Sequence, residues 1–312
     1  MVQHSYPLNV HGFKHFASQS VNQPIAPVPS GHRLTWRQRK LIVRSSENAP
    51  VILMPFQNQD WLVSCLEHSP VTLVKLDLTL GEIRLKAWAD ACLKAKKPAY
   101  LRLRQNPNAP QKKYPQLWYM KRVLDWLVAA LLLLLLSPLL VFLAGLIKVF
   151  SPGPILFKQW RVGERGKLFQ IIKFRTMVVG AEHLHHRVMQ NQEGLHKLPD
   201  DPRITPLGRL MRKYSLDELP QLLNVLRGEM SLVGPRPWAL YDAVRISPEL
   251  QHRLNAVPGI TGSWQVEARS HLRDLNVVNR GDLKYLCTWS ITKDLKFLLL
   301  TIPKVLTGFG AY

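Results

Sequence analysis

The feature that most limits how this chain can fold is an apolar run over residues 126–147, WLVAALLLLLLSPLLVFLAGLI. Its 22 residues carry no formal charge. A straight helix of that length measures about 33 Å, which is enough to cross a bilayer. Ser137-Pro138 stands in the middle of the run, and proline removes a backbone hydrogen bond and clashes with the preceding turn. Neither arm of the run is long enough to cross a bilayer alone.

Basic residues flank this run on both sides, Lys121 and Arg122 before it and Lys148 after it. Because basic residues mark the cytoplasmic flank of a membrane helix, the symmetry fits a helix that enters, bends at Ser137-Pro138 and leaves on the same face. The Ser137 hydroxyl can bond to a carbonyl that Pro138 leaves free. An ordinary transmembrane helix with a proline kink explains these residues equally well, so both topologies stay open on this pattern.

Charge restricts the partners of the 312-residue chain, whose net charge is +21 and whose pI is about 10.2. Residues 1–120 hold 16 Lys+Arg and 6 Asp+Glu, which gives +10, and the rest of the chain holds the remaining +11. A surplus spread over both halves suits anionic membrane lipid, nucleic acid or polyphosphate substrates. No nucleic-acid-binding signature is found, so nucleic acid is not expected as a partner. Three scattered cysteines without a Cys-x-x-Cys pair indicate neither a disulfide framework nor a zinc site.

Composition divides the chain into four parts. Residues 1–35 are polar and proline-rich and are expected to form a mobile arm, and residues 36–104 a small soluble α/β domain. Within that domain, 71–78 and 99–103 are expected strands around a helix over 82–96, which is a parallel βαβ pattern. It lacks a glycine-rich phosphate loop, so its role is regulatory, partner-binding or that of a spacer. Residues 105–118 are expected to form a linker, and 119–312 a membrane-associated domain with its membrane helix over about 121–149.

Beyond the apolar run, Ser151-Pro-Gly-Pro154 ends the helix, and residues 155–161 and 168–175 are expected extended segments. Residues 181–195 are expected to be helical. Four histidines lie there or just beyond, but no acidic or cysteine partner has ligand spacing, so a polar helix face is favoured over a metal site. These residues are His183, His185, His186 and His196.

The chemistry is concentrated in residues 200–237. Asp217-Glu218 precedes a short helix from about Pro220 to Leu226, which stops at Gly228, so the acidic pair lies at a helix N-terminus. Helix capping by Asp217, or by Ser215 with Glu218, is the favoured interpretation of these residues alone. The same helix end also draws phosphate, and then Asp217 is a plausible nucleophile on phosphorus and Glu218 a Mg²⁺ ligand.

Arginines surround this pair in the sequence: Arg203, Arg209 and Arg212 precede it and Arg236 follows it. Arg236 stands between two prolines in Gly234-Pro-Arg-Pro237, which restrict its backbone and pre-orient its guanidinium at little entropic cost. Planar, bidentate recognition of phosphate suits such an arginine.

Taken together, the motifs of residues 121–312 closely resemble those of the bacterial sugar transferase family, the monotopic polyprenyl-phosphate phosphoglycosyl transferases. Each motif alone is weak, but their order and spacing cover over half of the chain. They are the apolar run with Ser137-Pro138, Lys173-Phe-Arg-Thr-Met177, Asp201-Pro-Arg-Ile-Thr205, Ser215-Leu-Asp-Glu-Leu-Pro220, Gly234-Pro-Arg-Pro237, Pro258-Gly-Ile-Thr-Gly262, Trp264-Gln-Val266, Tyr285 and Asp294-Leu-Lys296.

The resemblance implies transfer of a sugar-1-phosphate from a nucleoside diphosphate sugar, with uridine the expected nucleoside, to polyprenyl (undecaprenyl) phosphate. It makes Asp217 the nucleophile of a covalent intermediate and Glu218 the Mg²⁺ ligand. Arg212 and Arg236 match arginines near the active site, and Arg269 an arginine that grips phosphate. Ser137 and Pro138 match the break of a re-entrant helix, which favours same-side entry and exit.

The expected fold is therefore α+β, a mostly helical monotopic membrane domain with a re-entrant hairpin broken at Ser-Pro, preceded by the small α/β domain. The expected location is the cytoplasmic face of the bacterial inner membrane. Ser263 and Val257 depart from residues common in the family, which leaves the sugar pocket open, and homo-oligomer formation is open as well. The alternative function is a non-catalytic, basic, membrane-associated scaffold of a glycan assembly complex.

Overall fold

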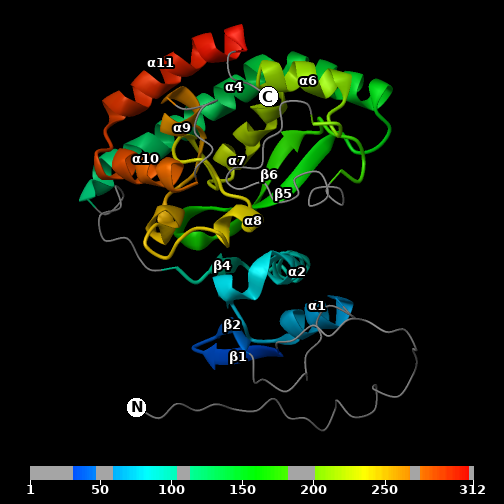
Figure 1. Ribbon diagram of the computed structural model, residues 1–312, viewed down its shortest axis with the longest axis vertical. Coiled ribbons are helices and arrows are strands. Elements are labelled where there is room, and N and C mark those ends of the chain that lie inside the picture. Colours follow the sequence, from blue (N-terminus) through cyan, green and yellow to red (C-terminus); the bar gives the residue numbers. More distant parts are fainter. Residues whose placement is uncertain (1–30, 47–58, 104–112, 182–200, 268–274, 309–312) are drawn as a thin grey trace. The chain divides into compact units, whose positions relative to one another are not determined.

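The structure, a computed structural model, describes residues 31–46, 59–103, 113–181, 201–267 and 275–308. The chain divides into two compact units, residues 1–100 and 101–312. Figure 1 shows the elements of both units.

Unit 1 is built on a four-stranded sheet of order β1-β2-β3-β4, whose last strand ends at Leu101. β1 and β2 form an antiparallel hairpin, and β2 pairs with β3 in parallel. A strand, a helix and a strand occur where the sequence predicts them, as β3, α2 and β4. The elements are β1 (Gly31–Arg37), β2 (Lys40–Ser46), α1 (Gln59–His68), β3 (Leu73–Leu76), η2 (Leu78–Leu80), α2 (Gly81–Lys94) and β4 (Ala99–Leu101).

Two boundaries differ from the sequence-based expectation. β1 begins at Gly31, inside the segment 1–35 expected to be a mobile arm, because its residues pair with β2 over the whole strand. Helix α4 begins at Pro115, inside the expected linker 105–118. Proline is well suited to the first turn of a helix, where its missing N–H costs nothing.

Unit 2 contains the apolar helix, a β5-β6 hairpin, a second small sheet and several short helices. In Figure 1, α4, α6 and α11 lie along one side of this unit, with β5 and β6 on their inner side. The two extended segments expected after the apolar run are confirmed as antiparallel β5 and β6. The elements are α4 (Pro115–Phe150), β5 (Leu156–Val162), η3 (Glu164–Gly166), β6 (Leu168–Phe174), α6 (Pro206–Lys213), η4 (Leu216–Gln221), α7 (Leu222–Leu226), β7 (Ser231–Val233), α8 (Leu240–Ala243), η5 (Gln251–Asn255), β8 (Gly259–Thr261), α9 (Ser263–Glu267), α10 (Leu275–Cys287) and α11 (Ile291–Thr307).

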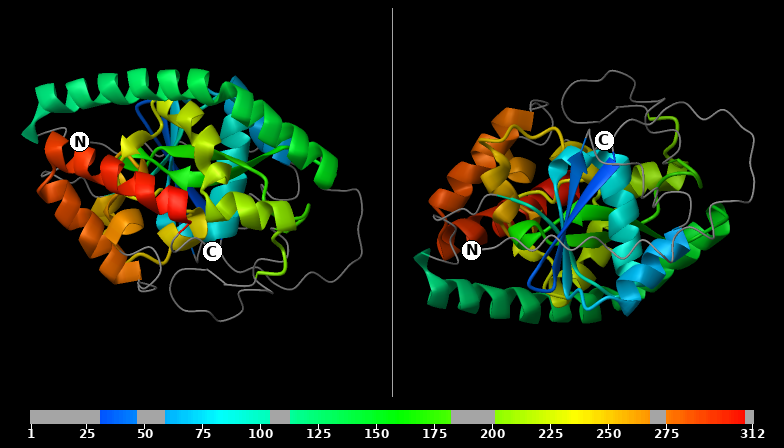
Figure 2. Two further views of the ribbon diagram at one scale, coloured as in Figure 1. Left: turned by 90° about the horizontal axis from the view of Figure 1, so that it is seen from above. Right: turned by 90° about the horizontal axis from the view of Figure 1, so that it is seen from below.

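Helix α4 runs for 36 residues and continues through Ser137-Pro138. The expected hairpin break is therefore not present as an interruption of the helix, although Figure 2 shows that the helix axis changes direction partway along. Continuity is possible because the Ser137 hydroxyl donates to the Leu134 carbonyl at 2.8 Å. That carbonyl is the one Pro138 leaves without a donor, as the sequence predicts. By length and composition alone, α4 could cross a membrane.

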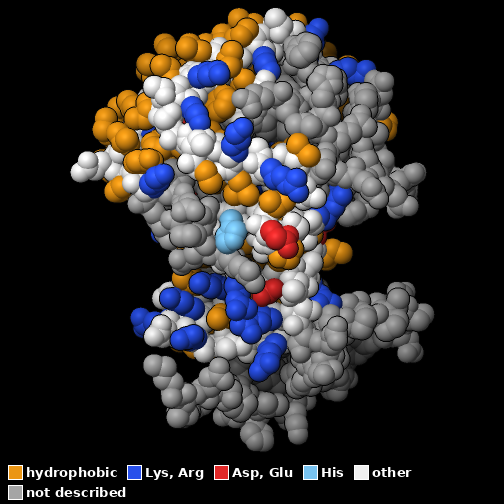
Figure 3. Space-filling model, turned by 60° about the vertical axis from the view of Figure 1, so that its left-hand side comes forward, with side chains coloured by type: hydrophobic (Ala, Val, Ile, Leu, Met, Phe, Trp, Pro, Cys, Tyr) orange, Lys and Arg blue, Asp and Glu red, His pale blue; other side chains and the backbone are white. Residues whose placement is uncertain are grey.

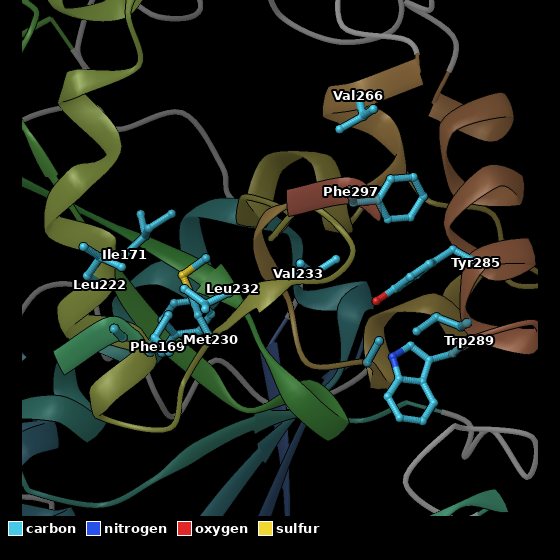
Figure 4. Packing of buried hydrophobic residues seen from close by; sticks show 14 residues of the cluster. Phe169, Ile171, Leu222, Met230, Leu232, Val233, Val266, Tyr285, Trp289 and Phe297 are labelled. Carbon is cyan, nitrogen blue, oxygen red and sulfur yellow. The ribbon is translucent and has the colours of Figure 1, made fainter. Parts of the chain in front are cut away.

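Both halves of α4 pack on the rest of unit 2. Ala129 belongs to the main apolar core, while Leu143 and Ile147 form a second cluster with Phe174 and Met211. In Figure 4, labelled side chains of the main core from β6, α7 and β7 gather on one side of Val233, with those of the C-terminal helices on the other. The labelled residues are Phe169, Ile171, Leu222, Met230, Leu232, Val233, Val266, Tyr285, Trp289 and Phe297.

A buried ionic group ties the start of α4 to α11. Lys121 Nζ lies 2.8 Å from Asp294 Oδ2 and 3.4 Å from Asp125 Oδ2. Asp294 also accepts hydrogen bonds from the Tyr285 hydroxyl at 2.6 Å and the Trp289 indole at 3.0 Å. Asp125 accepts from the Ser231 hydroxyl at 2.6 Å. Every carboxylate of the group is thus paired and hydrogen-bonded, as buried charges must be.

This arrangement gives the basic residues before the apolar run a structural role within the domain. Lys121 is buried, and Arg122 donates to the backbone carbonyls of Met230 at 2.8 Å and Gly228 at 3.0 Å. Both therefore hold the helix to its own domain. The charges of Lys121 and Arg122 therefore do not indicate membrane topology. Of the three basic residues that flank the apolar run, only Lys148 is left to indicate it.

Candidate active site

Asp217 lies in the first turn of the 3-10 helix η4 and is buried, with 8% of its surface exposed. The preceding Ser215 adopts a left-handed conformation (φ 54°), and its side chain makes no capping hydrogen bond. Asp217 is inside the helix, two residues past the N-cap position, which Ser215 occupies. Neither capping interpretation considered for this pair therefore describes the structure, and the carboxylate is left for another role.

Asp217 is a buried carboxylate whose pKa responds to two basic residues and one acidic residue. Burial raises its pKa, and the positive charge of Lys173 opposes that effect. The negative charge of Glu218 raises the pKa further, while Arg212 lowers it. The net direction is upward, which makes Asp217 less acidic than an exposed aspartate.

Glu218 points to the β5-β6 hairpin. Its Oε1 lies 2.6 Å from the ammonium of Lys173, which is at the end of β6 in the motif Lys173-Phe-Arg-Thr-Met177. In the same motif Thr176 accepts a hydrogen bond from Arg212 Nε at 2.9 Å. The motif therefore contacts the site twice. Lys173 pairs with Glu218 directly, and Thr176 binds Arg212, which lowers the pKa of Asp217.

Arg212 comes from the last turn of α6. That helix begins at Pro206, and the hydroxyl of Thr205 caps it by accepting from the Gly208 N–H at 3.0 Å. Ahead of the cap, Asp201 and Arg203 form a buried ion pair at 2.6 Å. The motif Asp201-Pro-Arg-Ile-Thr205 is thus the structure that starts α6 and directs Arg212 to Asp217.

Arg236 is carried on a loop whose backbone lies directly on another motif. β7 and β8 pair in parallel, the Gly234 N–H donates to the Thr261 carbonyl at 2.9 Å, and the Gly259 N–H donates to the Pro235 carbonyl at 2.9 Å. A Cβ on Gly259 would fall 2.0 Å from the Gly234 nitrogen. Glycine is required at this contact for close approach of two backbones.

Replacing Gly259 by alanine is therefore expected to destabilise the protein by roughly 3 kcal/mol and to displace Arg236, since the overpacked backbone must move. Thermal unfolding and turnover on the same samples would measure both effects. The control is Gly281→Ala in α10, where an added Cβ meets nothing within 4 Å. That variant should be neutral or up to about 1 kcal/mol more stable. Equal behaviour of the two variants would contradict this account.

Two buried arginines that the sequence does not single out fix the same loop from its other side. Arg253 donates to the Arg236 carbonyl and, at 2.6 Å, to Asp282 Oδ2. Arg161 of β5 donates to the Pro237 carbonyl at 3.0 Å. Burial lowers the pKa of both guanidiniums, and Arg236 and Glu218 are among the charges that Arg161 senses. These residues position Arg236, and only the three-dimensional structure reveals their partners.

Some of the other residues expected in the site cannot be placed, because the structure does not describe them. Arg269 and the histidines at 183, 185, 186 and 196 lie outside the described residues. Among the residues that are described, no group of three or more His, Cys, Asp or Glu side chains is suited to hold a metal ion. Mg²⁺ in phosphate-transfer sites is bound by one or two carboxylates together with substrate phosphates. Asp217 and Glu218 fit that mode, and Glu218 is the half-exposed member of the pair.

Lys173→Met tests the coupling within the site. Because Lys173 lowers the pKa of Asp217, its removal should raise that pKa further, and the ionised form then needs a higher pH. The acid side of the pH–rate profile is expected to move to higher pH, so that activity lost on the acid side recovers on the alkaline side. Lys173→Arg keeps the charge and should leave the profile in place. An unmoved profile in Lys173→Met would exclude this coupling.

An acidic pair, a lysine from a β-hairpin and arginines on restricted loops are the kinds of groups that a phosphate-transfer site requires. The profile of the bacterial sugar transferase family matches residues 116–308, well over half of the chain. The chain belongs to the bacterial sugar transferase family.

Relatives with assigned names agree with this membership. A UDP-glucose:undecaprenyl-phosphate glucose-1-phosphate transferase of Caulobacter vibrioides is 47% identical over 205 residues, which are 62% of this chain and 72% of that protein. The galactosyl transferase CpsE of Streptococcus agalactiae is 42% identical over 194 residues, 61% of this chain and 43% of CpsE. An undecaprenyl-phosphate galactose phosphotransferase of Salmonella typhimurium is 39% identical over 201 residues, 62% of this chain and 42% of that protein. The match thus spans less than half of the length of the last two.

Proposed function

We propose that this protein transfers a sugar-1-phosphate from a nucleoside diphosphate sugar, most simply a UDP-sugar, to polyprenyl phosphate through Asp217. The observation that carries the proposal is the buried Asp217 carboxylate, whose pKa is lowered by the charges of both Lys173 and Arg212, in a chain of the bacterial sugar transferase family. The names of the relatives, which specify glucose and galactose with undecaprenyl phosphate, support the substrate class.

In the first step, an Asp217 oxygen attacks the β-phosphorus, which bears the sugar. The bond from that phosphorus to the bridging oxygen breaks, and the nucleoside monophosphate leaves with the electron pair. A phosphosugar–aspartyl intermediate remains. In the second step, an oxygen of polyprenyl phosphate attacks the same phosphorus and the Asp217 carboxylate is released. The product, polyprenyl diphosphate sugar, starts the assembly of a lipid-linked glycan such as an exopolysaccharide.

The surroundings of Asp217 suit this sequence. Because Lys173 and Arg212 oppose the rise in the pKa of Asp217, they keep part of the carboxylate ionised for attack. Arg236, fixed by Arg253 and Arg161, supplies positive charge for the phosphate oxygens. Glu218 would hold Mg²⁺, which, when bound, neutralises charge on the leaving phosphate. Lys173, paired with Glu218 at 2.6 Å, holds that carboxylate in place.

Two helices support attachment to a membrane. Apolar side chains form an exposed stripe on α11 at spacings of four, three and four residues, at Leu295, Leu299, Ile302 and Leu306. The outer side of α4 exposes further large apolar residues, among them Leu134, Leu135, Val141, Phe142, Val149 and Phe150. Figure 3 shows hydrophobic side chains gathered over one end of unit 2. Such apolar faces on helices suit the lipid–water interface, where an enzyme with a lipid acceptor must work.

We place this surface on the cytoplasmic face of the inner membrane, with both ends of α4 on the same side. Support comes from the packing of both halves of α4 on one domain, because a domain attached to both halves of a helix cannot lie on opposite faces of a bilayer. Tags at residues 110 and 312 are therefore both expected to be reached by a membrane-impermeant reagent only from the cytoplasm. A C-terminal tag labelled from the periplasm would refute same-side topology.

The reaction is tested by incubating purified protein with a panel of UDP-hexoses and polyprenyl phosphate. Release of UMP and formation of lipid-linked sugar are expected with at least one donor and only with Mg²⁺ present. In the absence of acceptor, mass spectrometry of peptides should find phosphosugar on Asp217. Product formation without any trapped adduct would overturn the two-step mechanism. Membrane binding without turnover for any donor would favour the scaffold function instead.

A further inference from the structure

One face of the unit 1 sheet is strongly basic. In the hairpin, Arg33 pairs with Arg44 and Arg37 pairs with Lys40. In the parallel pair, Ile42 lies beside Lys75. Paired residues point to the same side of a sheet, and residues two apart share a face. Arg33, Arg37, Lys40, Arg44 and Lys75 therefore lie on one face, which we call the basic face.

The opposite face of the sheet forms the core of unit 1. Val43, Val74 and Leu76 are fully buried there, and the His32 ring meets Trp88 of α2 edge to face at 6.3 Å. The helices therefore cover the apolar face, and the basic face is turned away from the core. Arg33, Arg37 and Lys40 are exposed, and Figure 3 shows Lys and Arg side chains gathered over unit 1.

The charges on this face are not balanced within the part of unit 1 that the structure describes. Where β1, β2 and β3 are paired, the other residues of the face are Thr35, Ile42 and Leu73. The one acidic residue at its edge in these three described strands is Asp77, just past β3, whose N–H donates to the Val43 carbonyl, and it stands against five basic residues. Two like-charged pairs stand directly opposite each other, an arrangement that destabilises a sheet. An anionic partner would remove this repulsion, so the face is suited to bind one.

We propose that the basic face docks on the anionic head groups of the membrane. This rests on the membrane attachment of unit 2 in the proposed function. Thirteen residues separate Leu101, the end of β4, from Pro115, the start of α4, and they span at most about 45 Å. Unit 1 is thus always within reach of the bilayer, and tethering makes even a weak attraction effective. Each Lys or Arg side chain near an anionic leaflet adds to the attraction.

Nucleic acid fits the face less well. Binding of single strands relies on several aromatic side chains on which successive bases stack, and the described strands offer this face one, Tyr100 of β4, which alternates with the buried Ala99 and Leu101. Binding of duplex DNA remains a measurable outcome of the test below.

The test uses the full-length chain in lipid nanodiscs. Cys65 and Cys287, which are exposed, are replaced by serine, and a donor fluorophore is attached to Thr35→Cys in the middle of the basic face. Energy transfer to an acceptor on the head groups reports docking. Transfer is expected to be high in discs with about one third phosphatidylglycerol, low in discs of phosphatidylcholine alone, and reduced by salt.

Neutralising two charges with Arg37→Gln and Lys40→Gln should lower the ratio of docked to undocked unit 1 in anionic discs about 30-fold. The matched control, Lys94→Gln with Lys96→Gln, removes the same charge from the exposed end of α2 and its C-terminal turn and should keep the signal. UMP release should be unchanged in both double variants, because these residues lie outside the family-matched region.

Three results would overturn the proposal: equal transfer in neutral and anionic discs, equal loss in the control variant, or transfer that is unaffected by lipid charge and abolished by duplex DNA. The proposed function is judged separately on the same samples. Docking without UMP release would contradict the enzymatic activity alone. UMP release without docking would contradict only the basic-face proposal, and failure of the chain to enter discs would contradict membrane attachment and docking together.

Discussion

Replacing Asp217 by asparagine is expected to abolish UMP release and, at the same time, to make the protein more stable. The amide has no charge with which to attack phosphorus, so turnover should fall by a factor of about 10³ or more. Stability should rise because burial raises the pKa of Asp217 in the folded protein. Its carboxylate is therefore costly to ionise there, and this penalty grows as pH rises through the folded-state pKa.

The measurements are UMP release and thermal unfolding over a range of pH. At pH 7–8, Asp217→Asn should unfold roughly 2–4 °C above the wild type for each kcal/mol of relieved penalty. The difference should vanish in acid below the unfolded-state pKa of about 4, where both proteins are uncharged at this position. Asp60→Asn, at an exposed position of α1, is the control and should change neither quantity. Retained turnover would remove Asp217 from the mechanism, and lower stability would mean that it has a structural task.

Asp294→Ala is expected to cause the largest loss of stability. Asp294 is the nearest partner of the buried Lys121 and also accepts hydrogen bonds from Tyr285 and Trp289. Without it, Lys121 keeps only the longer contact with Asp125, and a buried charge that loses its partner costs about 3–5 kcal/mol. Chemical or thermal unfolding in detergent micelles would measure this loss.

Asp294→Asn separates charge from hydrogen bonding at the same position, because an amide oxygen can still accept from Tyr285 or Trp289. Its loss should be smaller than that of Asp294→Ala. Combining Asp294→Asn with Lys121→Met removes both charges, and the double variant should be more stable than the sum of the single losses predicts. Additive losses would show that Lys121 and Asp294 do not depend on each other in the folded protein.

Much of unit 2 could be predicted from the sequence because its signals are local. Proline and glycine punctuation placed β5, β6 and the end of α7 at Gly228, and Ser137 bonds to the carbonyl freed by Pro138 as expected. Helical continuity through Ser137-Pro138 was one of two topologies that the residues left open, and the family resemblance favoured the other, a helix broken at this point. The helical segment over 181–195 lies outside the described residues, so it stays a prediction.

At the site, the residues themselves were easier to predict from the sequence than the residues that they contact. The family resemblance assigned Asp217, Glu218, Arg212 and Arg236, and the acidic pair does lie at the start of a short helix. The ion pair of Glu218 with Lys173 joins residues 45 positions apart. Arg253 acts on the Arg236 carbonyl, a backbone atom that every residue type provides. Such contacts leave no local pattern in one sequence, so they required coordinates.

The attachment of α4 by buried charges at its start and by apolar side chains at its end has a consequence for how the proposed transferase would meet a lipid acceptor. Leu216, next to Asp217, packs in the same cluster as Leu143 and Ile147 of α4. If lipid surrounds the outer side of α4, the height of the Asp217 carboxylate above the acyl chains is set by protein packing. Bilayers of different thickness should then present the polyprenyl phosphate at one constant depth relative to Asp217.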